Sequence, residues 1–151
     1  MKHQSVGKRI GALSRAAHTF FQYHFRDFSI GHAQVITLNL IIRNNGIGQN
    51  ELVQHSGMDK SSVTSQLKIL EKNGYIIRKI DENDGRGRKI FITKKTEPLE
   101  PELLKKFTLW SELLLRGFSN PQREQIFQFL DIMINNANQA LKGLKEVEEN
   151  K

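Results

Sequence analysis

Apolar side chains recur every three or four residues over most of the chain, which is the spacing of one face of an α-helix. In the N-terminal third this spacing predicts two amphipathic helices, separated by a break at residues 29–31. Two shorter helices follow. Gly57 lies where the first of these would end in a left-handed cap, and Asp59 is a candidate N-cap of the second. The predicted helices cover about residues 5–27, 31–44, 49–55 and 60–73.

After Gly74 the spacing of the apolar residues changes from that of a helix to an alternating pattern. Residues 75–80 and 90–93 alternate apolar and polar side chains, which predicts two strands joined as a β-hairpin. Helical spacing then returns in two long stretches, the first through about residue 117 and the second from the capping sequence SNPQ at residues 119–122. A short helix, a turn, a second helix and a hairpin make a winged helix-turn-helix, so we expect a mainly α fold with a small β-hairpin wing. The long outer helices carry apolar stripes that need a partner.

The charge of the chain is unevenly distributed. The formal net charge is +7 at pH 7; residues 43–95 contribute eleven basic and six acidic side chains, whereas residues 96–151 contribute seven basic and nine acidic. A local positive field favours polyanions, chiefly nucleic acid, although a basic surface also occurs on proteins without such a partner.

Several classes of function are disfavoured by what the sequence lacks. It has no cysteine, which excludes disulfides, thiolate zinc sites and thiol nucleophiles. No run approaches the roughly 18 apolar residues of a membrane span, and the first nine residues are polar and basic, so we expect a soluble, cytoplasmic protein without a membrane partner. There is no glycine-rich phosphate loop, paired-carboxylate arrangement or nucleophile motif, so we expect neither enzymatic activity nor a cofactor. The five histidines form no recognisable metal site.

The helix predicted over residues 60–73 combines an apolar stripe with a small, polar outer face. In a helix-turn-helix the second helix enters the major groove, where hydroxyl groups contact base edges or phosphates and lysines contact phosphates. A polar face is also what any surface helix has, and the neighbouring short helix and hairpin are what favour a DNA-binding interpretation. The candidate contacts are Lys60, Ser61, Ser62, Thr64, Ser65 and Lys68.

The hairpin tip has the sequence DGRGRK, from Asp84 to Lys89. Arginine is favoured in a narrow minor groove, which concentrates negative potential, so Arg86 is the candidate for insertion. Arg88 and Lys89 are expected lower on the hairpin, as phosphate contacts, and Asp84 can orient a neighbouring arginine. A charged turn that keeps edge strands soluble is the alternative interpretation.

The stretch VTSQLKILEKNGYIIRKIDENDGRGRKIFIT, with ELVQHSGMDKSSVTSQL and HAQVITLNLI upstream, resembles the signature of the MarR-type winged-helix transcriptional regulators. The resemblance covers about residues 8–145. It implies a helical dimerisation domain of residues 1–30 and 98–148, in which a winged helix-turn-helix DNA-binding domain of residues 31–97 is embedded. It also implies a homodimer that acts as a repressor on a pseudo-palindromic double-stranded DNA operator, with one recognition helix in each of two successive major grooves. The sequence departs from the family's pattern at Thr96, where a glycine is common.

Proteins of this family commonly bind small aromatic or phenolic anions that weaken operator binding, so the resemblance also implies an effector site. The first predicted helix and the start of the second offer residues for an aromatic pocket, although ordinary core packing explains the same side chains. Arg15 or Arg26 would pair with a carboxylate. The candidate pocket residues are Arg15, His18, Phe21, Gln22, Phe25 and His32.

Two alternatives to a DNA-binding regulator remain open at this point. A winged helix can serve as a protein-interaction module of a larger assembly, but the face expected for that role is acidic or apolar, whereas residues 61–68 are polar and basic. An RNA-binding role would favour exposed stacking aromatics on a strand or loop, which the sequence lacks.

Overall fold

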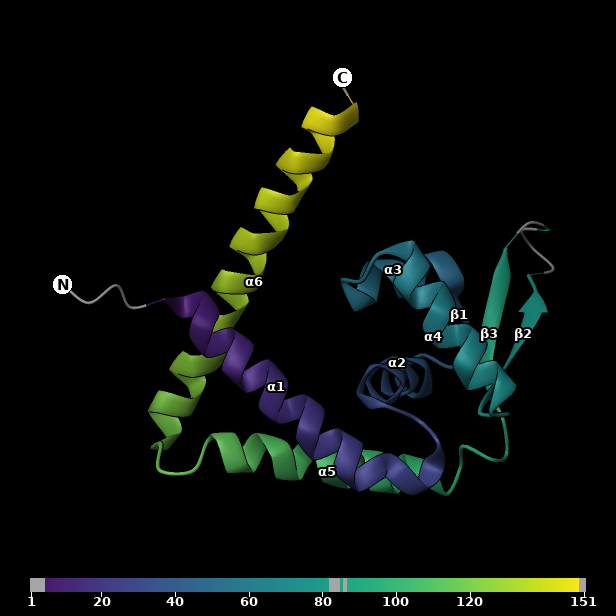
Figure 1. Ribbon diagram of the computed structural model, residues 1–151, viewed down its shortest axis with the longest axis horizontal. Coiled ribbons are helices and arrows are strands. Elements are labelled where there is room, and N and C mark those ends of the chain that lie inside the picture. The colour runs from purple at the N-terminus through teal and green to yellow at the C-terminus, as the bar shows by residue number, and fades with distance from the viewer. Residues whose placement is uncertain (1–4, 82–84, 86, 150–151) are drawn as a thin grey trace. The chain divides into compact units, whose positions relative to one another are not determined.

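The computed structural model describes residues 5–81, 85 and 87–149, and its helices follow the predicted order (Figure 1). The predicted mainly α fold with a winged helix-turn-helix is confirmed. The elements are α1 (Val6–Phe25), the 3-10 helix η1 (Arg26–Phe28), α2 (His32–Arg43), β1 (Ile47–Gly48), α3 (Gln49–Ser56), α4 (Lys60–Lys72), β2 (Ile76–Ile80), β3 (Arg88–Ile92), α5 (Leu99–Leu114) and α6 (Asn120–Glu149).

The sheet has three strands in the order β1-β3-β2, all antiparallel, and not the two of the predicted hairpin. Strand β1 has only two residues, and Ile47 pairs with Ile90 of β3. Two residues are too few to establish an alternating pattern in the sequence, which is why this strand was not predicted. The third strand also begins earlier than expected, at Arg88, so Arg88 and Lys89 lie on the strand.

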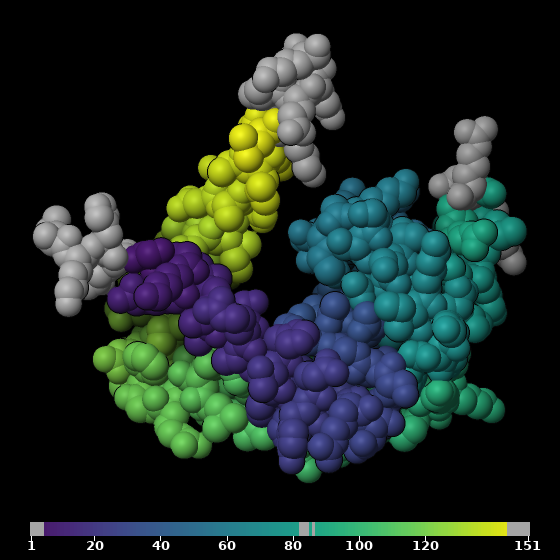
Figure 2. Space-filling view, in the orientation of Figure 1, coloured from purple at the N-terminus to yellow at the C-terminus, as the bar shows by residue number. Residues whose placement is uncertain are grey.

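One hydrophobic core joins α1, α2, α3, α4, the sheet and the start of α5. Its apolar side chains lose nearly all contact with water, and each stabilises the fold by roughly 1.5–3 kcal/mol relative to exposure. In the space-filling view these elements form one continuous mass from purple to teal (Figure 2). The largest side chains with under 2% exposure are Phe25, Leu38, Ile41, Leu52, Leu67, Leu70, Ile76, Ile90, Leu99 and Leu103.

The turn between α3 and α4 is built from the two residues predicted for it. Gly57 has φ of +65°, a left-handed conformation that costs a glycine little, and it ends α3. Asp59 caps α4, because its Oδ1 accepts the backbone N–H of Ser62 at 2.8 Å. These two local signals fix where the second helix of the helix-turn-helix begins.

Tyr75, at the entrance to β2, connects three segments that are distant in sequence. Its hydroxyl donates to the carbonyl of Phe28 at 2.7 Å, and its own carbonyl accepts the hydroxyl of Thr96 at 2.6 Å. Thr96 is completely buried, so the residue that departs from the family's glycine has a structural role here. It ties the end of the sheet to the segment that leads into α5.

The chain divides into two compact units, and the division falls within α5, between Trp110 and Ser111. In the second unit, Gln122 Oε1 accepts the backbone N–H of Ser119 at 2.9 Å, which confirms the predicted start of the last helix. None of the side chains described on α6 is buried. Its exposed large apolar residues are Phe127, Phe129, Leu130, Ile132, Met133, Ile134, Leu141 and Leu144. Among the described residues, no helix is both long enough and apolar enough to cross a membrane.

Candidate nucleic-acid interface

The first turn of α4 carries a compact network of hydroxyl groups around Asp59. Ser61 Oγ donates to Asp59 Oδ1 at 2.5 Å and Ser62 Oγ donates to Asp59 Oδ2 at 2.6 Å. These hydrogen bonds hold the pKa of the Asp59 carboxyl far below its usual range, so the group is charged at neutral pH. Both hydroxyl protons point at the carboxylate, which leaves the two serine oxygens free to act as acceptors.

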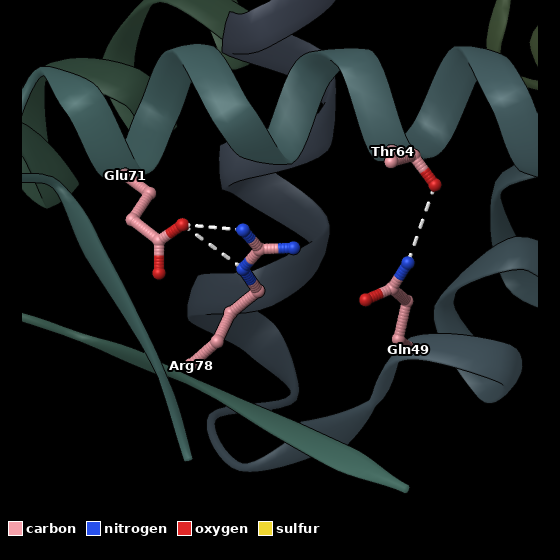
Figure 3. A network of polar contacts seen from close by, with 4 residues as sticks. All are labelled: Gln49, Thr64, Glu71 and Arg78. Atoms are coloured by element: carbon pink, nitrogen blue, oxygen red, sulfur yellow. Dashed lines mark hydrogen bonds and ion pairs between the residues drawn. The ribbon is translucent and has the colours of Figure 1, made fainter. Parts of the chain in front are cut away.

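Thr64, one turn later, uses its hydroxyl within the protein. Its Oγ1 donates to the carbonyl of Lys60 at 2.8 Å and accepts from Gln49 Nε2 at 3.3 Å (Figure 3). Thr64 is half-buried, in contrast to Ser65, which is exposed. The Gln49 contact joins the start of α3 to α4, so Thr64 lies where it can position the helix.

The C-terminal half of α4 is held by an ion pair with the sheet. The guanidinium of Arg78 on β2 contacts Glu71 Oε2 through Nη2 at 2.5 Å and Nε at 3.1 Å. Hydrogen bonding to Arg78 lowers the pKa of Glu71, and the Arg78 side chain is only 13% exposed. Figure 3 shows Thr64 and Glu71 pointing to the same side of α4, toward Gln49 and Arg78 respectively. Two separate elements therefore hold this helix, one near each end.

Three of the residues predicted on α4 to contact DNA have exposed lysine or serine side chains. Lys60, Ser65 and Lys68 are exposed, and no hydrogen bond or ion pair of their side chains occurs among the described residues. Ser61 is exposed and Ser62 half-buried. The structure thus brings a mixed hydroxyl and lysine face to the surface at the start and middle of α4.

The strands beside α4 supply further positive charge. Arg88 is exposed on β3, whereas Lys89 is half-buried and its Nζ lies 3.5 Å from Asp81 Oδ1. The carboxylate of Asp81 thus offsets part of the positive charge of Lys89. The other two predicted wing contacts, Asp84 and Arg86, lie outside the described residues.

A surface hollow of about 450 Å³ lies between the start of α3, the start of α4 and the base of the wing. Lys60 and Arg88 contribute positive charge to its lining, and Glu51 and Asp81 contribute carboxylates. Backbone of Gly48 and Gly87 completes part of the wall. Among the described residues that line the hollow, the two positive charges are matched by two negative charges, so the hollow has no excess of positive charge.

The candidate effector residues fall into two groups. Phe21 and Phe25 are 2% and 1% exposed and belong to the core, which is the alternative explanation that the sequence allowed. Arg15, His18 and Gln22 are exposed on α1. They lie outside the lining of the hollow.

His32 connects the two groups at the start of α2. Its ring centroid lies 5.6 Å from that of His18, edge to face, and 5.4 Å from that of Phe21, stacked. Burial lowers the pKa of His32, and the positive charge of His18 lowers it further. Within the described part of the chain, no group of three or more histidine, aspartate or glutamate side chains is arranged to hold a metal ion.

The positioning roles of Gln49, Glu71 and Arg78 could not be predicted from the sequence. Gln49 contacts Thr64, 15 residues away, and Arg78 contacts Glu71, 7 residues away. Each contact joins two different elements, and no local sequence pattern predicts such contacts. Arg78 and Glu71 were visible only as part of the family's signature.

The fold and this surface define a winged helix-turn-helix protein with exposed lysines on α4, the second helix of that motif. The sequence model described as "MarR family" matches residues 30–87. A MarR transcriptional regulator from Methanosarcina mazei Go1 is 31% identical, with 89% of this chain and 96% of that chain covered and a TM-score of 0.80. This chain belongs to the MarR family of transcriptional regulators.

Two further relatives span most of the chain. The uncharacterized HTH-type transcriptional regulator YybA of Bacillus subtilis (strain 168) is 28% identical, over 82% of each chain. A MarR-family structure from Listeria monocytogenes, complexed with a 26mer DNA, is 27% identical with a TM-score of 0.83; 88% of this chain and 89% of that chain are covered.

Proposed function

We propose that this protein binds double-stranded DNA in a sequence-specific manner as a homodimer and represses transcription from a pseudo-palindromic operator. The observation that carries the proposal is the exposed hydroxyl and lysine face of α4, on a helix held at both ends by Gln49 and Arg78. A rigidly held helix with such a face suits the major groove, where small polar side chains reach base edges. The Listeria relative crystallised with DNA supports the same partner for this chain.

The proposed DNA contacts divide into those that bind phosphates and those that read bases. Lys60, Lys68 and Arg88 would bind phosphates, and Lys89 would do so from its ion pair with Asp81. Arg86 would enter the minor groove, with Asp84 orienting it. These contacts set affinity and its dependence on salt, because each neutralised phosphate releases counterions.

The side chains that read bases would be the hydroxyl-bearing residues of α4. Since Asp59 takes the protons of Ser61 and Ser62, their oxygens would accept hydrogen bonds, which favours bases with an amino group in the major groove, namely cytosine and adenine. Ser65 is exposed and keeps both donor and acceptor capacity. Thr64 would act mainly through its bond with Gln49.

The dimer would form through residues 1–30 and 98–148, leaving residues 31–97 as the DNA-binding domain. The exposed apolar side chains of α6, and Ile10 and Leu13 on α1, support a partner surface of this kind. In a two-fold dimer the recognition helices would enter major grooves about one helical turn apart.

The DNA-binding proposal is tested with a duplex selected from a random pool by the protein itself, compared with a scrambled duplex over a series of salt concentrations. We expect tight, salt-sensitive binding with a clear preference for the selected duplex. Lys68→Ala should weaken binding to both duplexes to a similar degree and reduce the salt slope by about one, whereas Ser65→Ala should change the preference between them. Failure to select any duplex, or equal effects of both variants on both duplexes, would refute the assignment.

We also propose that a small aromatic or phenolic anion binds near His18 and His32 and weakens DNA binding. The two imidazoles meet at the junction of α1 and α2, with exposed Arg15 and Gln22 on the same helix as His18. Benzoate and phenol are suitable probes, monitored by release of the labelled duplex. Release by benzoate that is lost in His18→Ala and Arg15→Ala would support the site, and unchanged release in both variants would contradict it.

A further inference from the structure

The recognition helix is tied to α2 by a pair of side-chain amides. Gln34 lies in the first turn of α2 and Gln66 in the middle of α4, and both are half-buried. The amide nitrogen of Gln34 donates to Gln66 Oε1, and Gln34 Oε1 accepts the backbone N–H of Gly31 at 2.8 Å. The Gln34 side chain is thus fixed on both sides, by the start of its own helix and by α4.

We propose that Gln34 and Gln66 are a positioning pair that sets how α4 lies against α2, and thereby how well α4 distinguishes one DNA sequence from another. The inference rests on the proposed function, because it concerns the helix that would read the DNA. Gln66 directly follows the exposed Ser65 in the sequence and comes two residues before Lys68. A small displacement of Gln66 therefore displaces the proposed contacts on either side of it.

The remaining packing between α2 and α4 does not fix the position of α4 by itself. Apart from Thr37, the buried side chains of these two helices are apolar, as Leu38 and Leu67 are. Apolar contact is non-directional and roughly proportional to area, so it tolerates small shifts along the contact. A hydrogen bond between two half-buried amides has a defined length and direction, and separating them leaves polar groups unpaired. A directional polar pair of this kind is suited to fixing the register of packed helices.

Gly31 offers a way to disturb Gln34 without altering either amide. A Cβ placed at residue 31 would lie 2.9 Å from Gln34 Oε1 and 3.4 Å from Gln22 Oε1. The φ of Gly31 is −91°, which alanine adopts without strain. Gly31→Ala should therefore push the Gln34 amide aside and weaken its contact with Gln66, while α4 keeps its own sequence.

Thr37 provides a matched control on the same helix. Its side chain is fully buried, and its hydroxyl has no hydrogen-bond partner among the described residues. Thr37→Val removes a polar group from α2, as Gln34→Leu does, but leaves the amide pair intact. Loss of an unpaired hydroxyl should leave stability unchanged or raise it.

The experiment uses the full chain and two duplexes, one selected from a random pool by the wild-type protein and one scrambled. The affinity ratio for the two duplexes and the thermal unfolding midpoint are measured for wild type, Gln34→Leu, Gln66→Leu, the double variant, Gly31→Ala and Thr37→Val. We expect each leucine variant to lower the affinity ratio about tenfold, with scrambled binding changed by less than about twofold. The double variant should lose no more than either single variant, because both remove the same interaction. Gly31→Ala should give an intermediate loss, and Thr37→Val none.

Three results would overturn the inference. One is a variant whose affinity falls equally for both duplexes. Another is a double variant whose affinity ratio falls by the product of the two single-variant factors. The third is a Gly31→Ala protein whose affinity ratio equals that of the wild type. If the leucine variants unfold, Gly31→Ala alone decides the test. A wild-type protein that selects no duplex would overturn the proposed function as well, whereas selection with an unchanged ratio in the variants would overturn the positioning role alone.

Discussion

Helices α4 and α6 are both amphipathic, yet they bury their apolar side chains to very different degrees. In α4 the stripe of Val63, Leu67 and Leu70 is completely buried within the chain. In α6 no described side chain is buried, and Phe127 and Leu130 remain 53% and 40% exposed. The winged helix is therefore complete within one chain, whereas α6 has an apolar surface that water does not favour. This difference supports the proposed homodimer, in which a second chain would cover that surface.

The largest expected effect is on the assembly of the two chains. Leu130→Glu would place a carboxylate in the proposed interface, twice in a symmetric dimer, and burying an unpaired charge is costly. We expect the dimer dissociation constant to rise about a thousandfold, equivalent to about 4 kcal/mol. Sedimentation equilibrium at micromolar concentration would then report a monomer.

Gln128→Glu is the control for this variant, because it adds the same charge to α6 at a polar position about 160° around the helix from Leu130. It should leave the mass of the dimer unchanged. A Leu130→Glu protein that still sediments as a dimer would remove α6 from the proposed interface.

The second effect concerns the stability of the winged helix alone. Leu67→Ala removes three carbons from a fully buried site in α4 and should cost about 3 kcal/mol of unfolding free energy. Urea unfolding at fixed protein concentration measures this loss, and the folded variant should remain a dimer. A loss below about 0.5 kcal/mol would mean that α4 does not depend on the packing described here.

A smaller effect is expected from the Arg78–Glu71 ion pair. Glu71→Gln should cost about 1 kcal/mol at neutral pH, a modest figure because the Glu71 side chain is 37% exposed and water screens the pair. The pKa of Glu71 is lowered in the folded protein, so the stabilisation is fully present above the unfolded value of about 4.3 and is lost as the pH falls through the folded value. Unfolding of the variant should therefore depend less on pH in the acid range. Glu97→Gln, which removes an exposed carboxylate, serves as the control and should not alter that dependence.

The smallest effect is expected at the start of α2. Because burial and His18 lower the pKa of His32, the unfolded chain binds a proton at this residue more readily than the folded chain does. Stability should thus fall as the pH is lowered below the unfolded value of about 6.5, and His32→Gln should reduce that slope. His55→Gln, at an exposed position, is the comparison. Equal slopes in the two variants would show that His32 does not contribute.

The elements that local chemistry determines could be predicted from the sequence. Gly57 and Asp59 mark the turn of the helix-turn-helix through their own backbone and side-chain preferences, and the structure has both in the predicted roles. The apolar stripe of α4 could be predicted because a helix that buries one face has apolar residues every three or four positions.

Contacts between distant residues could not be predicted in this way. Strand β1 exists because Ile47 meets Ile90 across the sheet, and the bond between Gln34 and Gln66 spans 32 residues. Aromatic residues at helical spacing suit both a core and a ligand pocket, and core packing, the interpretation that the spacing favours, is where the structure has Phe21 and Phe25. Which residues bind DNA stays a prediction for the α4 and wing residues alike.

The most direct test of the central claim is the mass of the complex formed with the selected duplex, measured by native mass spectrometry. We expect two chains per duplex for the wild-type protein and no such complex for Leu130→Glu at the same concentration. One chain per duplex, bound as tightly in the wild type as in Leu130→Glu, would contradict the proposal that this protein reads DNA as a dimer.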